Sequence, residues 1–250
     1  RNSSHSRYGE MVTLKWGLQQ SNNWISAYLM SKLNPQAFVT LLREYGINNP
    51  EIHPSMSLCL GPCDITVAEM VSAYTAFVNH GIRTAPLLVT RIEDNEGNVV
   101  AQFRPRMNEV ISEESAHKML YMLKAVIDGG TGGRLRYMYN ITGEVGGKTG
   151  TTNNNSDAWF MGITPNLVSG CWVGGDDRDI HFSMTSIGQG ASGALPIWAY
   201  FMKSVYADKR LGYSPEAVFD LPPGYNPCKM DESGLDATFN AGGNIEDIFE

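Results

Sequence analysis

Three short strand-like segments follow one another in the second half of the sequence. They lie around residues 146–152, 158–164 and 167–174, and Pro165-Asn166 makes a tight turn between the last two. Strands joined by so short a turn pair antiparallel, because a parallel crossover needs a dozen residues or more. The sequence therefore predicts an antiparallel sheet, to which the rest of the chain must pack.

Helical segments occupy much of the first half and close the folded part. Asn34-Pro35 combines a capping amide with proline at the first helical position, residues 66–69 form a capping box, and Ser112 caps a further helix. A last apolar periodicity covers residues 195–206, while residues 87–103 predict two strands around a turn. Helices first, then strands, then a helix predict an α+β fold, an antiparallel sheet flanked by helices.

The composition changes near residue 212. Prolines, glycines and acidic residues dominate from there, and the last basic residue is Lys229. We expect residues 1–211 to form one domain and residues 212–250 to be an acidic, Pro/Gly-rich and poorly ordered C-terminal extension. Four cysteines are too few for a disulfide scaffold, although the turn between Cys59 and Cys63 could bring this pair to bridging distance.

Charge and spacing disfavour several classes of function. The chain carries 19 lysines and arginines against 26 acidic residues, a net charge of −7, so clustered cations for nucleic acid are not expected. No apolar stretch reaches the roughly 18 residues that span a bilayer. Among the five histidines, no pair has the spacing of a zinc site, so we expect no metal and no cofactor.

The glycine-rich segment 143–149 admits two interpretations. A phosphate-binding loop needs Gly-x-x-x-x-Gly-Lys followed by Ser or Thr, and here the first glycine is one residue too close. Such a loop must also open a helix, whereas the run Asn153–Asn155 consists of poor helix formers. The alternative is a strand carrying Lys148-Thr149-Gly150, on which a positive charge and a hydroxyl bind a carboxylate and the glycine lets another backbone approach.

A Ser-x-Asn triplet, Ser21-Asn22-Asn23, lies at the start of a predicted helix. Taken alone, Ser21 is most simply the N-cap of that helix. Taken with Lys148-Thr149-Gly150 further along the chain, the triplet follows the order of motifs in the penicillin-recognising serine enzymes.

The match extends well beyond these two motifs. Its segments are Val12-Thr13-Leu14, Leu60-Gly61-Pro62, Gly130-Thr131-Gly132, Gly147–Asn153, Asp157–Phe160, Thr164–Leu167 and Trp172-Val173-Gly174. Together they resemble the transpeptidase domain of class A penicillin-binding proteins over most of residues 8–206. Class B proteins, low-molecular-mass carboxypeptidases and class A β-lactamases lack the extended run after Lys-Thr-Gly.

The resemblance implies the penicillin-binding protein/β-lactamase-like serine transpeptidase fold. It implies a peptidoglycan D,D-transpeptidase that acts on stem peptides ending in D-Ala-D-Ala and is acylated by β-lactams. Ser21 and Lys148 would relay protons, and Asn23 would hydrogen-bond the donor peptide. The carboxylate would bind at Thr149, Gly150 and Thr151. The implied location is the periplasmic face of a bacterial inner membrane, with an anchor outside this sequence.

One motif of the family is missing. The nucleophile is expected in a Ser-x-x-Lys motif before Ser-x-Asn, and the only such spacing here, Ser115 to Lys118, follows it in an ordinary amphipathic helix. We therefore expect the C-terminal part of a transpeptidase domain, incomplete at the N-terminus and inactive alone. The strand at residues 167–174 would then have an unpaired edge, through which the chain could self-associate. A carboxypeptidase or β-lactamase-type hydrolase and a non-catalytic peptide- or partner-binding fragment stay open as alternatives.

Overall fold

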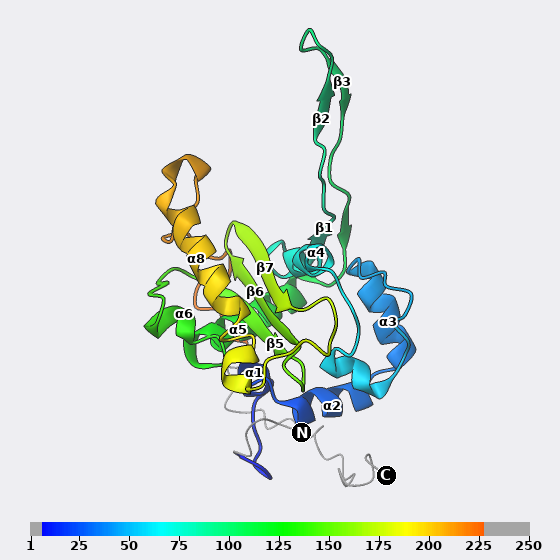
Figure 1. Cartoon of the computed structure of the whole chain (residues 1–250), viewed down its shortest axis with the longest axis vertical. Helices are drawn as coiled ribbons and strands as arrows, with labels where there is room; N and C mark the ends of the chain where they lie inside the picture. The colour runs from blue at the N-terminus through cyan, green and yellow to red at the C-terminus, as the bar shows by residue number, and fades with distance from the viewer. Residues whose placement is uncertain (1–6, 228–250) are drawn as a thin grey trace.

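A three-stranded antiparallel sheet lies at the centre of the computed structural model, which describes residues 7–227 (Figure 1). Its strands are β5 (Gly146–Thr151), β6 (Asp157–Thr164) and β7 (Leu167–Gly174), in the order β5-β6-β7. This is the predicted antiparallel meander. Among the described residues β5 and β7 have no strand on their outer sides, as expected for residues 167–174.

Helices cover both faces of this sheet. Helix α8 (Ala194–Ala207) packs on β6 and β7 from one side, and α4 (Val67–Val78) and α5 (Glu113–Gly129) pack from the other. The smaller helices are α1 (Leu14–Gln19), α2 (Asn23–Ser31), α3 (Pro35–Glu44), η1 (Met56–Leu60), α6 (Arg134–Tyr137), α7 (Thr185–Gly188) and η2 (Lys209–Leu211). The α+β prediction is therefore confirmed.

Helices α3 and α4 begin where the sequence predicts. The side chain of Asn34 accepts hydrogen bonds from Gln36 N and Ala37 N, with proline at the next position of the chain. At the start of α4, the Thr66 hydroxyl accepts from Glu69 N, and the Glu69 carboxylate accepts from Thr66 N. These caps satisfy amide groups that the first helical turn leaves without partners.

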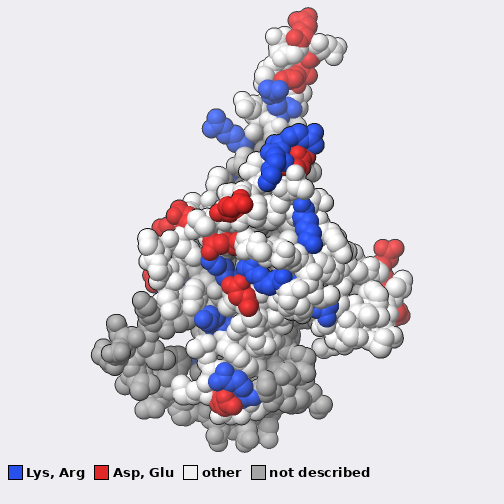
Figure 2. Space-filling view, turned by 90° about the vertical axis from the view of Figure 1, so that its left-hand side faces the viewer, with Lys and Arg blue, Asp and Glu red and all other residues white. Residues whose placement is uncertain are grey.

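A long hairpin projects from the body (Figure 1). At its base β1 (Ile82–Thr84) pairs with β4 (Met107–Glu109), and further out β2 (Arg91–Glu93) pairs with β3 (Val99–Gln102). Figure 2 shows acidic side chains at the hairpin tip and charges of both signs interspersed over the face in view.

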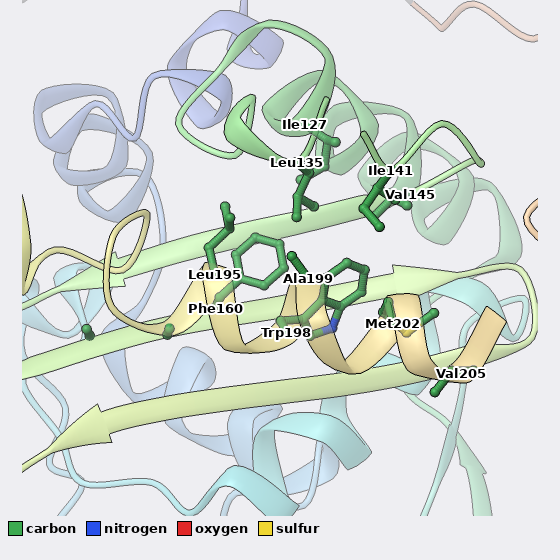
Figure 3. Packing of buried hydrophobic residues seen from close by; sticks show 12 residues of the cluster. Ile127, Leu135, Ile141, Val145, Phe160, Leu195, Trp198, Ala199, Met202 and Val205 are labelled. Atoms are coloured by element: carbon green, nitrogen blue, oxygen red, sulfur yellow. The ribbon is translucent and has the colours of Figure 1, made fainter. Parts of the chain in front are cut away.

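The main core fills the space between α8 and the sheet (Figure 3). The rings of Phe160 on β6 and Trp198 on α8 meet edge to face, with centroids 5.2 Å apart, and both are almost fully buried. The indole N–H of Trp198 donates to Ser169 Oγ at 2.7 Å, so its polar atom is satisfied. Gly162 lies beneath this indole, where a Cβ would come within 2.3 Å of the ring.

Trp172 on β7 is 40% exposed, and its indole nitrogen donates to Asp157 Oδ1 at 2.9 Å. Two expectations, for the cysteine pair and for the C-terminal extension, need correction. Cys59 and Cys63 are free thiols and do not form the bridge that their spacing allowed, and Cys59 Sγ donates to Met56 O at 3.2 Å. The described part of the C-terminal extension is packed rather than loose, with Phe219 buried against α5 residues; residues 228–250 lie outside the described part of the chain.

No helix within residues 7–227 combines the length and apolarity needed to cross a bilayer.

The α8 packing yields a stability prediction. Trp198→Ala removes an indole that is 2% exposed, so it should lower the free energy of unfolding by about 3–5 kcal/mol in urea denaturation. Ile197→Ala changes the neighbouring residue, whose side chain is 52% exposed, and should lower it by less than about 1 kcal/mol. Similar losses in the two variants would contradict the assigned packing.

Candidate active site

The Lys-Thr-Gly motif lies on β5, as the strand interpretation predicts. Within this strand Lys148 is half-buried and Thr149 is buried. On the other side of β5, Gly150 pairs with Trp159 of β6, whose Cβ lies 3.1 Å from where a Gly150 side chain would begin. The glycine thus leaves room for the half-buried Trp159 beside the motif.

Ser21 lies in the turn between α1 and α2, in a left-handed conformation with a φ of 53°. The expectation that Ser21 caps α2 is wrong, because the side chain of Asn22 accepts from Ile25 N at 3.1 Å and serves as the N-cap. Asn23 is the first residue of α2 and is half-buried. The capping role of Asn22 leaves the Ser21 hydroxyl available for another partner.

That partner is Lys148. Its ammonium nitrogen donates to Ser21 Oγ at 2.8 Å, although the two residues are 127 positions apart in the sequence. The same nitrogen donates to the Thr149 carbonyl at 2.7 Å. Burial lowers the pKa of Lys148 from 10.5 to about 8, because desolvation disfavours the charged form.

A glycine-rich loop after α5 holds the Ser21 turn against β5. Thr131 N donates to Gln19 O at 3.2 Å, and the hydroxyls of Thr131 and Thr149 share a hydrogen bond of 2.7 Å. A Cβ on Gly130 would lie only 2.3 Å from Gln19 O, so this approach requires glycine. Sequence reasoning did not place Thr131 in the site, although Gly130-Thr131-Gly132 was among the segments that resemble the family.

A second segment closes on the end of β5. Gly190 N donates to Thr151 Oγ1 at 3.0 Å, and a Cβ on Gly190 would lie 2.5 Å from Gly150 O. Arg134 donates to Ser192 Oγ at 2.9 Å and links α6 to the same segment. The structure therefore brings Ser21, Lys148 and Thr149–Thr151 into one region, while Asn23 lies at the start of the adjoining helix.

The Ser-x-x-Lys spacing at residues 115–118 has an ordinary structural explanation. The ammonium group of Lys118 pairs with Glu114 at 2.6 Å on the exposed face of α5. Ser115 Oγ accepts a hydrogen bond from the Ser112 hydroxyl at the helix start. Serine and lysine are thus each engaged elsewhere, as the sequence interpretation expects.

This arrangement can move protons and bind an anion. A lysine amine with a lowered pKa, in hydrogen-bond contact with a hydroxyl, can pass a proton in either direction near neutral pH. The same amine, when charged, and the hydroxyls of Thr149 and Thr151 offer partners for a carboxylate. The chemistry fits an acyl-transfer site better than a phosphate loop, because the motif lies on a strand and no helix begins within residues 146–184.

Known proteins share this sequence pattern. The chain matches the family described as penicillin binding protein transpeptidase domain over residues 1–169. It is 34% identical to penicillin-binding protein 1A of Aquifex aeolicus over 89% of this chain and 29% of the relative. It is 33% identical to penicillin-binding protein 1B of Vibrio cholerae over 87% of this chain and 27% of the relative. The chain thus spans less than a third of the length of these relatives.

The fold agrees with these matches. The crystal structure of penicillin-binding protein 1A from Haemophilus influenzae superposes with a TM-score of 0.73 at 27% identity, covering 85% of this chain and 36% of the other. A Mycobacterium tuberculosis structure, PonA1 in complex with penicillin V, has a TM-score of 0.67 at 23% identity, covering 84% and 59%. The fold, the motif order and the extended sequence match agree, and this chain belongs to the penicillin-binding protein transpeptidase-domain family, in its class A branch.

Proposed function

We propose that this chain forms part of the acyl-transfer site of a peptidoglycan D,D-transpeptidase. The observation that carries the proposal is the 2.8 Å contact between Lys148 Nζ and Ser21 Oγ. The contact joins the Ser-x-Asn and Lys-Thr-Gly motifs of the penicillin-recognising enzymes. The outer edge of β5, which carries Lys-Thr-Gly, is not paired with another strand of the described residues.

The reaction has two steps. A nucleophilic serine attacks the carbonyl of the penultimate D-alanine of a stem peptide, forms an ester and releases the terminal D-alanine. The amine of a second stem then attacks the ester, forms the cross-linking amide and returns the serine hydroxyl. A β-lactam acylates the same serine through its ring carbonyl, and the amide bond of the ring breaks. The nucleophilic serine would come from a Ser-x-x-Lys segment outside this sequence.

Each site residue has a role in these steps. Ser21 and Lys148 carry a proton toward the departing nitrogen, which is why their close contact matters. Thr149 and Thr151 bind the donor carboxylate with Lys148, and the backbone of Thr151 supplies an oxyanion-hole donor. Asn23 hydrogen-bonds the donor peptide, and Gly150 allows the donor backbone to approach the strand. The enzyme would work in the periplasm, tethered by an anchor outside this sequence.

A hydrolase is the alternative within the same chemistry. A carboxypeptidase or β-lactamase would pass the acyl group to water instead of an amine, and the match to a transpeptidase-domain family supports transfer to an amine. Product analysis of a complete domain with and without an acceptor amine distinguishes them, since only a transpeptidase forms the new amide.

Replacing Lys148 tests the choice of motif. In a complete domain that carries the nucleophile, Lys148→Ala should slow acylation by a fluorescent penicillin at least about 100-fold, because charge and proton relay are both lost. Lys118→Ala is the matched control and should leave the rate nearly unchanged, since Lys118 pairs with Glu114 at the surface. Equal losses in both variants would reject the assignment.

The lowered pKa of Lys148 predicts a pH dependence. The positive charge that binds the carboxylate is lost as the pH rises through about 8, so the second-order acylation rate should fall above that pH. Lys148→Arg, slower overall, keeps its charge and should show no such fall in stopped-flow measurements. A wild-type rate that stays constant or rises through pH 8 would contradict the role assigned to the charged ammonium group.

The 250-residue chain alone should resist acylation. Ser21 contacts Lys148, but in the family pattern that pair relays protons to a different serine, and Lys118 pairs with Glu114 instead of serving Ser115 as a base. Incubation with fluorescent penicillin followed by a denaturing gel should leave the chain unlabelled. A stoichiometric labelled band at 27.5 kDa would place the nucleophile within these residues and contradict this account.

A further inference from the structure

Two histidines and a glutamate meet at a place remote from the candidate active site. His80 follows the end of α4, while Glu113 and His117 lie one turn apart at the start of α5. One donor atom from each side chain lies within 4.8 Å of the others. The cluster is therefore assembled from two helices that pack against each other.

The donor atoms have the spacing of metal ligands. Glu113 Oε1 lies 2.8 Å from His80 Nδ1 and 3.8 Å from His117 Nε2. Ligand atoms about 2.0 Å from a tetrahedral zinc ion are separated by about 3.3 Å, so small side-chain movements suffice to place all three around one ion. Without an ion, the Glu113–His80 contact is an ordinary hydrogen bond.

One ring nitrogen in the cluster has no hydrogen bond. His117 Nε2 is buried from solvent and has no hydrogen-bond partner, and the side chain is only 12% exposed. A buried imidazole nitrogen without a partner is destabilising, and coordination of a cation through its lone pair would satisfy it. This observation is independent of the spacing and points into the same cluster.

A further carboxylate supports the orientation of His80. Asp220 Oδ2, from the C-terminal extension, lies 3.4 Å from His80 Nε2, on the opposite side of the ring from Glu113. Metal-bound histidines commonly direct their second nitrogen to a carboxylate, which fixes the ring and raises its basicity. Asp220 is placed for this supporting role: with the Nε2 proton directed to Asp220, Nδ1 of His80 would be free to bind an ion.

We propose that His80, Glu113 and His117 form a binding site for a divalent transition-metal cation of the zinc class. Two imidazoles and a carboxylate suit Zn²⁺, whereas Mg²⁺ and Ca²⁺ prefer oxygen ligands throughout. His117 is about 18 Å along α5 from Gly129, where the loop that supports Ser21 begins, so the ion would lie away from the transpeptidase chemistry. Its effect would be structural, joining the end of α4 to α5 beside the extension.

The test uses the whole chain, freed of metal with a chelator, and zinc chloride as the probe. Isothermal titration at pH 7.5 should give one strong site, and melting temperature should rise by about 5 °C at hundred-fold excess over Kd. His117→Gln and Glu113→Gln should each weaken binding at least about 10-fold. His80→Asn should do the same, and asparagine tolerates the left-handed φ of 51° at this position.

His53→Gln is the matched control, because His53 is an exposed histidine outside the cluster and its loss should leave the strong site intact. Circular dichroism and metal-free melting of each variant separate lost binding from lost folding. The proposal is overturned if the chain shows no strong zinc site, or if His53→Gln weakens binding as much as His117→Gln in folded protein. Magnesium binding as strong as zinc binding in the same titration would also overturn the proposal.

Discussion

Close contact between the loop after α5 and the turn after α1 holds the candidate active site together. The contact depends on Gly130, where any side chain would overlap the carbonyl of Gln19. Thr131 then makes two links, one to that carbonyl and one to the hydroxyl of Thr149 on β5. Two residues after Gln19, Ser21 reaches Lys148 because the turn is held at this position.

The electrostatics of the site follow from the same packing. Lys148 is enclosed by the turn and the sheet, and burial rather than a neighbouring charge lowers its pKa to about 8. An amine with that pKa is partly charged near neutral pH, so it can attract a carboxylate and still exchange a proton with Ser21. A fully exposed lysine would offer the charge but would exchange protons poorly at that pH.

The cluster at His80, Glu113 and His117 illustrates how the same helix can serve two regions. The C-terminal end of α5 leads into the loop that supports Ser21, while its first turns carry Glu113 and His117. A cation bound there would stabilise the packing of α4 on α5 without contact with Ser21 or Lys148. Helix α5 would then be held at both ends, by ligands at one and by glycine contacts at the other.

Local patterns in the sequence determined the helix caps at Asn34 and Thr66, the meander of residues 146–174 and the motif on β5, because each depends on neighbouring residues. Only the tertiary structure decided that Asn22 caps α2 and frees Ser21, that Thr131 supports the site, and that Trp172 is exposed. It also joined His80 to Glu113 and His117, which histidine spacing does not reveal. These features depend on contacts between residues distant in sequence, and burial and donor geometry exist only once the segments have packed.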